Sequence, residues 1–226
     1  MDIASTRAIV FDLDDTLYPE WAFTFSGYQA VARAFAERLG ARMDELVARM
    51  RELFDTPDRG RVFDVVIAEL EVANAESLVP KMIETFRSHK PAIQLHPDAD
   101  VALTRLHGQY SLGLLTDGPL LMQRSKIEAL GLQPRFNEII LTDQWGREHW
   151  KPHPKAFQEM SARLGVPHAA CTYVADNPAK DFLAPNVLGW RTVFVRRPDG
   201  IYRDKEPPAG GAAQITIQTL DALPLD

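Results

Sequence analysis

Three aspartates follow a short apolar run near the beginning of the sequence. The run covers residues 8–11, and the stretch FDLDDTLYPE then contains Asp12, Asp14 and Asp15. Like charges at the end of a buried element repel one another and lose hydration, which costs free energy unless something compensates. Carboxylates placed in this way can bind a hard cation, act as a nucleophile or transfer protons. The spacing therefore indicates a site.

Polar residues also follow apolar runs further along the chain. In open α/β sheets ligands bind beyond the carboxyl ends of the strands, so the residues at those ends are candidates for the same site. Lys151, in HWKPHPKAF, precedes the helix that leads into the fourth expected strand. Taken alone, it would be interpreted as a solvated surface lysine. The candidates that follow the first, second and fourth strands are Asp12, Asp14 and Thr16, then Thr116 and Asp117, then Asp176, with Asp181 shortly after.

The pattern of apolar residues predicts the elements that position these side chains. Continuous β-favouring runs predict strands at 8–11, 111–115, 138–141, 172–175 and 191–195, with a short edge strand around Ile215 and Ile217. Helical periodicity predicts helices at 99–107, 120–130, 154–164 and 179–188. Strands separated by helices of about 10 to 15 residues are typical of a doubly wound parallel sheet, so we expect an α/β, Rossmann-like core.

A block with little strand signal separates the first strand from the rest of the sheet. Helical patterns run from Trp21 and through 43–54, 62–72 and 76–87. We therefore expect an all-helical insertion at 18–91 and a core formed by 1–17 and 92–226. The aromatic stripe of Trp21, Phe25, Tyr28 and Phe35 fits the core of this insertion, with Trp21 and Phe25 as candidates to contact a ligand.

The bulk composition limits the classes of partner. The chain has 226 residues, 46% of them hydrophobic, and a formal net charge of -6, which argues against a general affinity for nucleic acid or anionic membranes. One cysteine excludes an internal disulfide, and the sequence has neither a secretory leader pattern nor a run long enough to span a bilayer. We expect a cytoplasmic protein whose partner is a small molecule.

Four segments together resemble the motifs of the haloacid dehalogenase superfamily, most members of which are phosphatases. FDLDDTL resembles the first motif, DxDxT; LLTDG resembles the second, an apolar strand that ends in Thr or Ser; WKPHP resembles the third; and VADNPAKD resembles the fourth, with its two spaced aspartates. All four occur in order over nearly the whole core. The helical insertion lies between the first two motifs, where one subclass carries a helical cap that determines specificity.

The resemblance implies a role for each candidate. Asp12 would attack phosphorus to form an aspartyl-phosphate, and Asp14 would protonate the leaving oxygen and later deprotonate water. Mg²⁺ would be bound by the carboxylates of Asp12 and Asp176 and the backbone carbonyl of Asp14. Lys151 would neutralise charge, and Thr116 and Asp117 would belong to the phosphate-binding loop. Asp181 would support the site or pair with Lys151, and it could also cap the helix at 179–188. We expect Thr16 to fix the loop.

Three positions depart from the commonest pattern of the family. Ala175 stands where glycine is usual, Asp117 where asparagine is common, and His153 where aspartate is usual. None of the three removes a catalytic group. Since side chains alternate along a strand, Asp12 and Asp14 are expected to point to the same side, and Asp15 is expected to be a surface or turn residue.

The resulting hypothesis is a Mg²⁺-dependent phosphatase for a small phosphomonoester, a nucleotide or a sugar phosphate, with nucleotides favoured by the aromatics that open the cap. A phosphomutase would carry the same four motifs. A 2-haloacid dehalogenase is disfavoured because its chemistry does not need the acid at Asp14. A phospho-receiver module is shorter and has no such insertion, so it fits least well.

Overall fold

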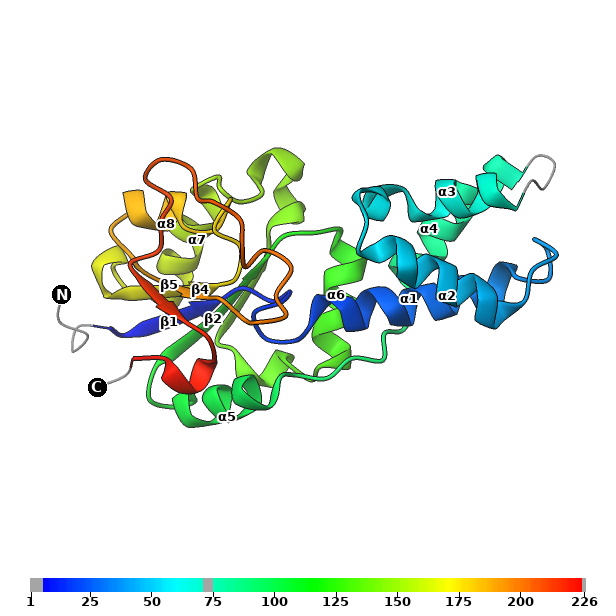
Figure 1. Ribbon diagram of the computed structural model, residues 1–226. Helices are drawn as coiled ribbons and strands as arrows, with labels where there is room; N and C mark the ends of the chain where they lie inside the picture. The colour runs from blue at the N-terminus through cyan, green and yellow to red at the C-terminus, as the bar shows by residue number, and fades with distance from the viewer. Residues whose placement is uncertain (1–5, 71–74, 225–226) are drawn as a thin grey trace. The chain divides into compact units, whose positions relative to one another are not determined.

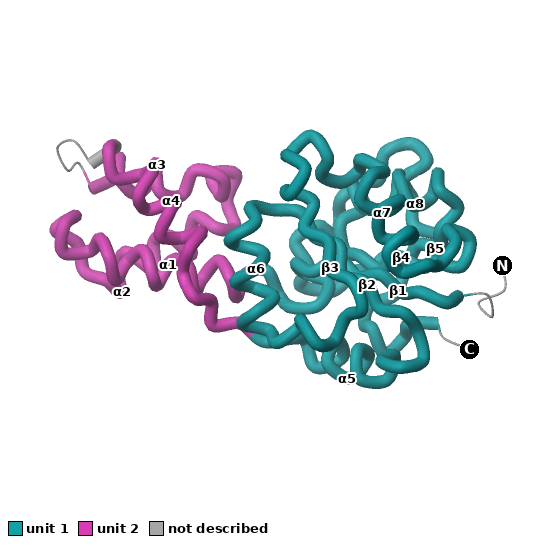
Figure 2. Tube along the Cα trace, turned by 180° about the vertical axis from the view of Figure 1, so that it is seen from behind, with its two compact units in different colours: residues 1–20, 94–226 teal, residues 21–93 magenta. Residues whose placement is uncertain are grey.

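The computed structural model describes residues 6–70 and 75–224, and the chain forms two compact units. One unit comprises residues 1–20 and 94–226 and the other residues 21–93, as Figure 2 shows in teal and magenta. The second unit corresponds to the segment expected as a helical insertion at 18–91. No helix among the described residues is long and apolar enough to cross a membrane.

The larger unit is built on a parallel sheet (Figure 1). Six strands are described, in the spatial order β3-β2-β1-β4-β5-β6, and neighbouring strands pair in parallel. Their bounds are β1 (Ala8–Phe11), β2 (Ser111–Thr116), β3 (Glu138–Leu141), β4 (Cys171–Ala175), β5 (Arg191–Val195) and β6 (Ile215–Ile217). The predicted doubly wound α/β fold is confirmed.

Helices cover both faces of this sheet. They are α5 (Pro97–Leu106), α6 (Leu120–Ala129), α7 (Lys155–Leu164) and α8 (Leu183–Val187), with α5 on one side and α7 and α8 on the other in Figure 1. Alternate residues of the strands face α7, where Val10 and Tyr173 pack in one buried cluster with Phe157 and Met160. β1 is buried along its whole length, as its unbroken apolar sequence predicts.

The order of the strands places a topological switch point at β1. The chain proceeds from β1 to β2 and β3 on one side, then returns to β4 on the other side and continues outward to β5 and β6. In such sheets the connections diverge beyond the carboxyl ends of the two strands at the switch, and the crevice between them is the usual ligand site. The residues that follow β1 and β4 therefore lie where a substrate is expected.

The helix predicted at 179–188 begins later than expected. α8 covers only Leu183–Val187, because residues 177–181 form a turn that is closed by side chains. The Asn177 side chain accepts from the N–H of Ala179 at 3.1 Å, and the Asp181 carboxylate accepts from the N–H of Asn177 at 2.9 Å. Side chains that bind nearby backbone groups in this way compete with the helix.

The smaller unit is helical. Its elements are α1 (Glu20–Phe35), which begins at the last residue of the larger unit, α2 (Met43–Phe54), α3 (Val62–Glu69) and α4 (Val79–Ser88). The helix predicted at 62–72 is described as far as Glu69, and its last two residues lie outside the described part of the chain. Aromatic side chains form the core: Tyr28 is buried against Phe63 and Phe86.

Candidate active site

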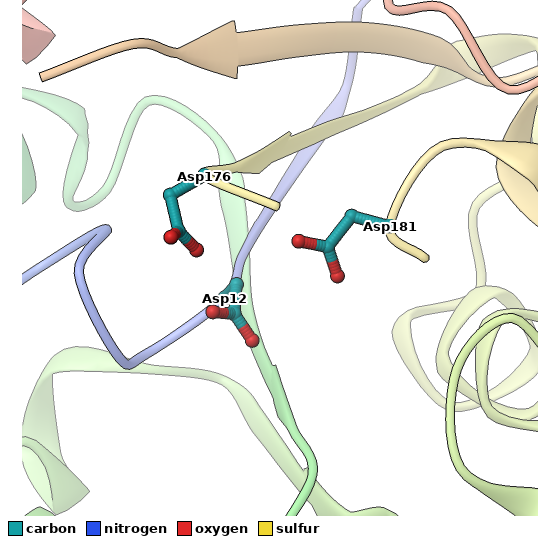
Figure 3. Close-up of side chains that lie close together, drawn as sticks. All are labelled: Asp12, Asp176 and Asp181. Atoms are coloured by element: carbon teal, nitrogen blue, oxygen red, sulfur yellow. The ribbon is translucent and has the colours of Figure 1, made fainter. Parts of the chain in front are cut away.

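Three aspartates meet where β1 and β4 end side by side. Asp12 follows β1, and its N–H donates to the carbonyl of Val174 on β4 at 2.9 Å; Asp176 follows β4 directly. Asp181 lies in the turn before α8, fixed by its bond to the N–H of Asn177. The three side chains come from different elements and are all buried, and each offers a carboxylate oxygen within 4.8 Å of the others (Figure 3).

A lysine is buried next to these carboxylates. Lys151 Nζ is 2.5 Å from Asp12 Oδ1 and 2.8 Å from Asp181 Oδ1, and it donates to the hydroxyl of Tyr173 at 2.9 Å. The Lys151 side chain has no exposed surface, so the alternative of a solvated surface lysine is wrong. One ammonium group thus links the end of β1 to the turn that follows β4.

The Asp14 carboxylate is held by its own loop and by α6. Lys126 Nζ lies 2.7 Å from Oδ1, Gln123 Nε2 donates to Oδ2 at 2.9 Å, and the hydroxyl of Tyr18 donates to Oδ1. Lys126 and Gln123 are both buried, whereas the Asp14 side chain keeps 22% of its surface exposed. Asp14 is therefore anchored from within the protein and still borders solvent.

The end of β2 brings the second motif to the same edge. Thr116 is buried, and its Oγ1 accepts a bond from Gln123 Nε2 at 2.6 Å. The Asp117 carboxylate accepts from Lys180 Nζ at 2.9 Å, from Thr142 Oγ1 at 2.8 Å and from the backbone N–H of Lys151 at 3.2 Å. The negative charge of Asp117, at a position where asparagine is common, is thus compensated by hydrogen-bond donors from three other segments.

The remaining two loop residues are held inside the protein. Thr16 is fully buried: its Oγ1 donates to Asp176 Oδ1 at 3.4 Å, and its carbonyl accepts from Arg197 at 2.9 Å. Asp15 does lie in a turn, with a positive φ of 53°, but the expectation of a surface position is wrong. Its carboxylate is buried because it accepts from the backbone N–H groups of Glu20 and Ile201 at 2.7 and 3.0 Å.

Comparison with known proteins identifies the family of this chain. Residues 9–195 match the model of the haloacid dehalogenase-like hydrolases. The chain belongs to this family. The sequence is 32% identical over 209 residues to a glyceraldehyde 3-phosphate phosphatase of Methanopyrus kandleri, with 89% of this chain and 88% of that protein covered.

Two further relatives of this hydrolase are phosphatases. A phosphoserine phosphatase of Thermus thermophilus is 28% identical over 192 residues, which cover 84% of this chain and 73% of that protein. The crystal structure of a phosphatase of the same superfamily from Thermococcus onnurineus matches with a TM-score of 0.62 and 25% identity, over 96% of each chain. The predicted superfamily and the predicted enzyme class, a phosphoric monoester hydrolase, are confirmed.

The buried charges of the hydrolase are unevenly compensated. Burial raises the pKa of Asp12 to about 7, opposed by the charge of Lys151 and reinforced by that of Asp181. Burial also raises the pKa of Asp176 well above its ordinary value, with the charges of Asp12 and Asp181 adding to the effect. Lys151 is desolvated too, but the negative charges of Asp12 and Asp181 keep its pKa well above the ordinary value. The site has more negative than positive charge at its centre.

A divalent cation fits this excess of negative charge. Asp176 Oδ2 is buried and has no hydrogen-bond partner among the described residues, which is costly for a carboxylate oxygen. Asp12 and Asp176 supply the hard oxygen ligands that Mg²⁺ prefers, and Asp181, the third member of the cluster, is paired with Lys151. Haloacid dehalogenase-type phosphatases generally use Mg²⁺, and the donor set of this chain suits it.

Asp14 has the opposite electrostatic environment. Burial would raise the pKa of its carboxyl group, but the charge of Lys126 and the hydrogen bonds from Lys126, Tyr18 and Gln123 outweigh burial and lower the pKa below its ordinary value. Asp12 and Asp14, two residues apart in the sequence, thus differ in the direction of their pKa shifts. This is the reverse of what the expected roles require, since the expected nucleophile has the raised pKa and the expected acid the lowered one.

Several side chains of the site were absent from the sequence-based interpretation. Gln123 and Lys126 lie on the helix expected at 120–130, for which no site residue was predicted, and no local spacing marks them as buried. Lys180 stands directly before Asp181, and Tyr173 lies on β4 facing Lys151; both belong to segments that contain recognised motifs. The expectation that Asp181 lies in the first turn of a helix is wrong, since α8 begins at Leu183.

Proposed function

We propose that this hydrolase is a Mg²⁺-dependent phosphatase that releases phosphate from a small phosphomonoester through an aspartyl-phosphate on Asp12. The observation that carries the proposal is the position of Asp12: it is buried at the switch point of the sheet, with Lys151 at 2.5 Å and two further carboxylates within 4.8 Å. A carboxylate nucleophile needs a compensating cation, because the substrate that it approaches is itself an anion.

The first half of the proposed reaction forms the covalent intermediate. Lys151 binds Asp12 Oδ1, so Oδ2 is the oxygen that attacks phosphorus while the bond from phosphorus to the ester oxygen breaks. The negative charge of a bound substrate phosphate raises the pKa of Asp14, which the donors of the free enzyme hold low. Asp14 is then protonated and gives this proton to the departing oxygen, which leaves as an alcohol. Thr116 and the backbone N–H groups of its loop donate hydrogen bonds to the phosphoryl oxygens, and Lys151 neutralises part of their charge.

The second half returns the enzyme to its starting state. Asp14, now a carboxylate, takes a proton from a water molecule as that water attacks phosphorus, and the Asp12 carboxylate departs. The carboxylates of Asp12 and Asp176 and the backbone carbonyl of Asp14 would hold Mg²⁺, which when bound would offset the repulsion between Asp12 and the substrate phosphate. We place Asp181 beside the metal site as the partner of Lys151.

The relatives support a small leaving group. The phosphatases from M. kandleri and T. thermophilus are named for glyceraldehyde 3-phosphate and phosphoserine, both three-carbon phosphate esters. We therefore place small sugar phosphates and similar short esters ahead of nucleotides as the substrate class. The helical unit at 21–93 would act as the cap, since a cap excludes water during phosphoryl transfer and contacts the leaving group.

Two other reactions that occur on the same fold, phosphoryl transfer by a phosphomutase and dehalogenation, each differ from phosphatase chemistry at one step. A phosphomutase would keep its phosphoenzyme until a second substrate arrives, so decay of the phosphoenzyme in water alone argues for a phosphatase. A 2-haloacid dehalogenase does not need a proton donor at Asp14, and the three buried donors on that carboxylate are unexplained by such a reaction.

The test is hydrolysis of p-nitrophenyl phosphate with and without Mg²⁺. Asp12→Asn is expected to abolish turnover, and removal of metal by a chelator is expected to do the same until Mg²⁺ is restored. Asp58→Asn, at an exposed position of the helical unit, is the matched control and should leave kcat unchanged. The proposal would be refuted if Asp12→Asn kept full activity, or if a chelator left the activity of the wild-type enzyme unchanged.

A further inference from the structure

Helix α6 presents two buried polar side chains to Asp14. Gln123 and Lys126 are three positions apart and so lie on the same face of the helix. Gln123 is fully buried and Lys126 is 2% exposed, and each contacts a different oxygen of the Asp14 carboxylate, at 2.9 Å and 2.7 Å. Donors on both oxygens fix the plane of a carboxylate as well as its place.

Gln123 also connects Asp14 to the second motif. Its Nε2 donates to Thr116 Oγ1 at 2.6 Å as well as to Asp14 Oδ2. The space for this side chain depends on Gly118, where a Cβ would lie 3.1 Å from Gln123 Cδ and where φ is +129°, a conformation that favours glycine. The same amide therefore spans the ends of β1 and β2.

This arrangement is poorly explained by stability alone. A buried ion pair seldom stabilises a fold more than apolar side chains of the same volume would, because both charges lose their hydration. Gln123 Oε1 is in addition buried without a hydrogen-bond partner among the described residues, which destabilises the fold. We therefore infer that the benefit of Gln123 and Lys126 lies in their effect on Asp14.

We propose that Lys126 and Gln123 are positioning residues that orient the Asp14 carboxyl group for proton transfer to the leaving oxygen, and that Gln123 keeps it in register with the phosphate-binding Thr116. The inference rests on the proposed function. After the proton has moved to the leaving oxygen, the carboxylate that remains is held by the same two donors until it takes a proton from the attacking water. Both side chains are buried, and the proposed role does not require either of them to contact the substrate.

Dependence on the leaving group separates this role from a purely structural one. An ester with a good leaving group, such as p-nitrophenyl phosphate, needs little proton donation, whereas an alkyl ester such as glycerol 2-phosphate depends on it. General acid catalysis typically contributes about 10²–10⁴-fold. If Lys126 and Gln123 act through Asp14, their loss must harm the alkyl ester much more than the nitrophenyl ester. A general structural defect would harm both alike.

The experiment compares kcat and KM of Lys126→Met and Gln123→Met on the two esters. For both variants we expect kcat on the alkyl ester to fall by about 100-fold and kcat on p-nitrophenyl phosphate by less than about 10-fold, with KM little changed. Gln123→Met removes no charge and tests the idea even if Lys126→Met fails to fold. Arg124→Met, an exposed cation of the same helix, is the matched control and should behave as wild type.

A double-mutant comparison completes the test. In the Asp14→Asn background Lys126→Met should not lower kcat further, because Lys126 acts through Asp14. Gln123→Met should lower it far less than in the wild-type enzyme, because only its bond to Thr116 is then left to lose. Equal losses on the two esters, no loss on either, or fully additive losses with Asp14→Asn would overturn the inference. These results are distinguishable from failure of the proposed function, which would instead appear as activity that survives Asp12→Asn.

Discussion

Asp176→Asn should make the metal-free protein more stable while destroying its response to Mg²⁺. Without a cation, Asp12 and Asp176 are like charges with oxygens within 4.8 Å of one another. At that separation two unit charges repel by about 3.5 kcal/mol for an effective dielectric constant of about 20. Asp176→Asn removes this repulsion and so stabilises the folded state. Part of the gain in stability is offset because the buried amide that replaces the carboxylate must itself be desolvated. We expect a net increase of about 1–3 kcal/mol in the free energy of unfolding.

The assay is thermal unfolding at pH 8, with EDTA or with excess Mg²⁺, followed by tryptophan fluorescence. Trp145, Trp150 and Trp190 belong to the larger unit, so the signal reports mainly on the unit that holds the site. A gain of this size corresponds to several degrees in Tm. Saturating Mg²⁺ at about 100 times Kd should stabilise the wild-type protein by about 2.7 kcal/mol and Asp176→Asn by much less.

The same repulsion predicts the pH dependence of the metal-free protein. Burial, together with the charge of Asp181, raises the pKa of Asp12 to about 7, above its value in the unfolded chain. Its contribution to stability is therefore complete below about pH 4 and is lost as the pH rises toward 7. The exposed variant Asp58→Asn is the control and should unfold as the wild-type protein does. The reasoning would be refuted if Asp176→Asn were less stable than the wild-type protein in EDTA, or if Mg²⁺ stabilised it as much as the wild-type protein.

Three further substitutions test other parts of the molecule. Lys151→Met should lower kcat by at least about 100-fold and the free energy of unfolding by about 3 kcal/mol, since two buried carboxylates lose their shared cation; steady-state kinetics and urea unfolding measure the two effects. The free energy of unfolding should decrease between pH 7 and pH 5 by about 1 kcal/mol less in His96→Gln than in the wild-type protein. Burial lowers the pKa of His96 to about 4, so the stability that it contributes is present above about pH 6.5 and is lost as the pH falls toward 4. Urea unfolding of both proteins at pH 7 and pH 5 measures this. An equal loss of unfolding free energy between the two pH values in the wild-type protein and in His96→Gln would contradict it. Gly27→Ala should destabilise the helical unit by about 1–3 kcal/mol, because a Cβ there would lie 2.5 Å from the ring of Phe86, whereas Gly60→Ala has open space and should be neutral in thermal unfolding followed by circular dichroism.

The sheet was predictable because its strands are short segments rich in apolar and β-branched residues between clear turn signals, and β1 is apolar throughout. The strands at 138–141 and 191–195 begin and end where the sequence placed them. β5 is a covered strand, whereas β3 is an edge strand of which only Ile140 is buried. The helix at 179–188 was wrong at its start. Side chains of Asn177 and Asp181 there bind backbone groups, and periodicity does not register that competition.

The site could be predicted only in part, because strand ends are visible in a sequence and long-range pairing is not. The positions of Asp12 and Asp176 follow from the carboxyl ends of adjacent parallel strands. The pairing of Asp14 with Lys126 depends on how α6 packs across more than a hundred residues of chain, and nothing in the local pattern of the helix reveals it. Asp15 is buried by contact with Ile201, another long-range partner.

The most direct test of the central claim is the location of the phosphoryl group during turnover. The enzyme, with Mg²⁺ and p-nitrophenyl phosphate, is quenched in acid within the first turnovers, digested and mapped by mass spectrometry, with Asp14→Asn used to slow hydrolysis of the intermediate. The account predicts a phosphoryl group on the peptide that contains Asp12, at Asp12 itself, and its loss when the unquenched enzyme is chased with buffer alone. A phosphoryl group on any other residue, or turnover by Asp14→Asn with no phosphoenzyme at any quench time, would contradict it.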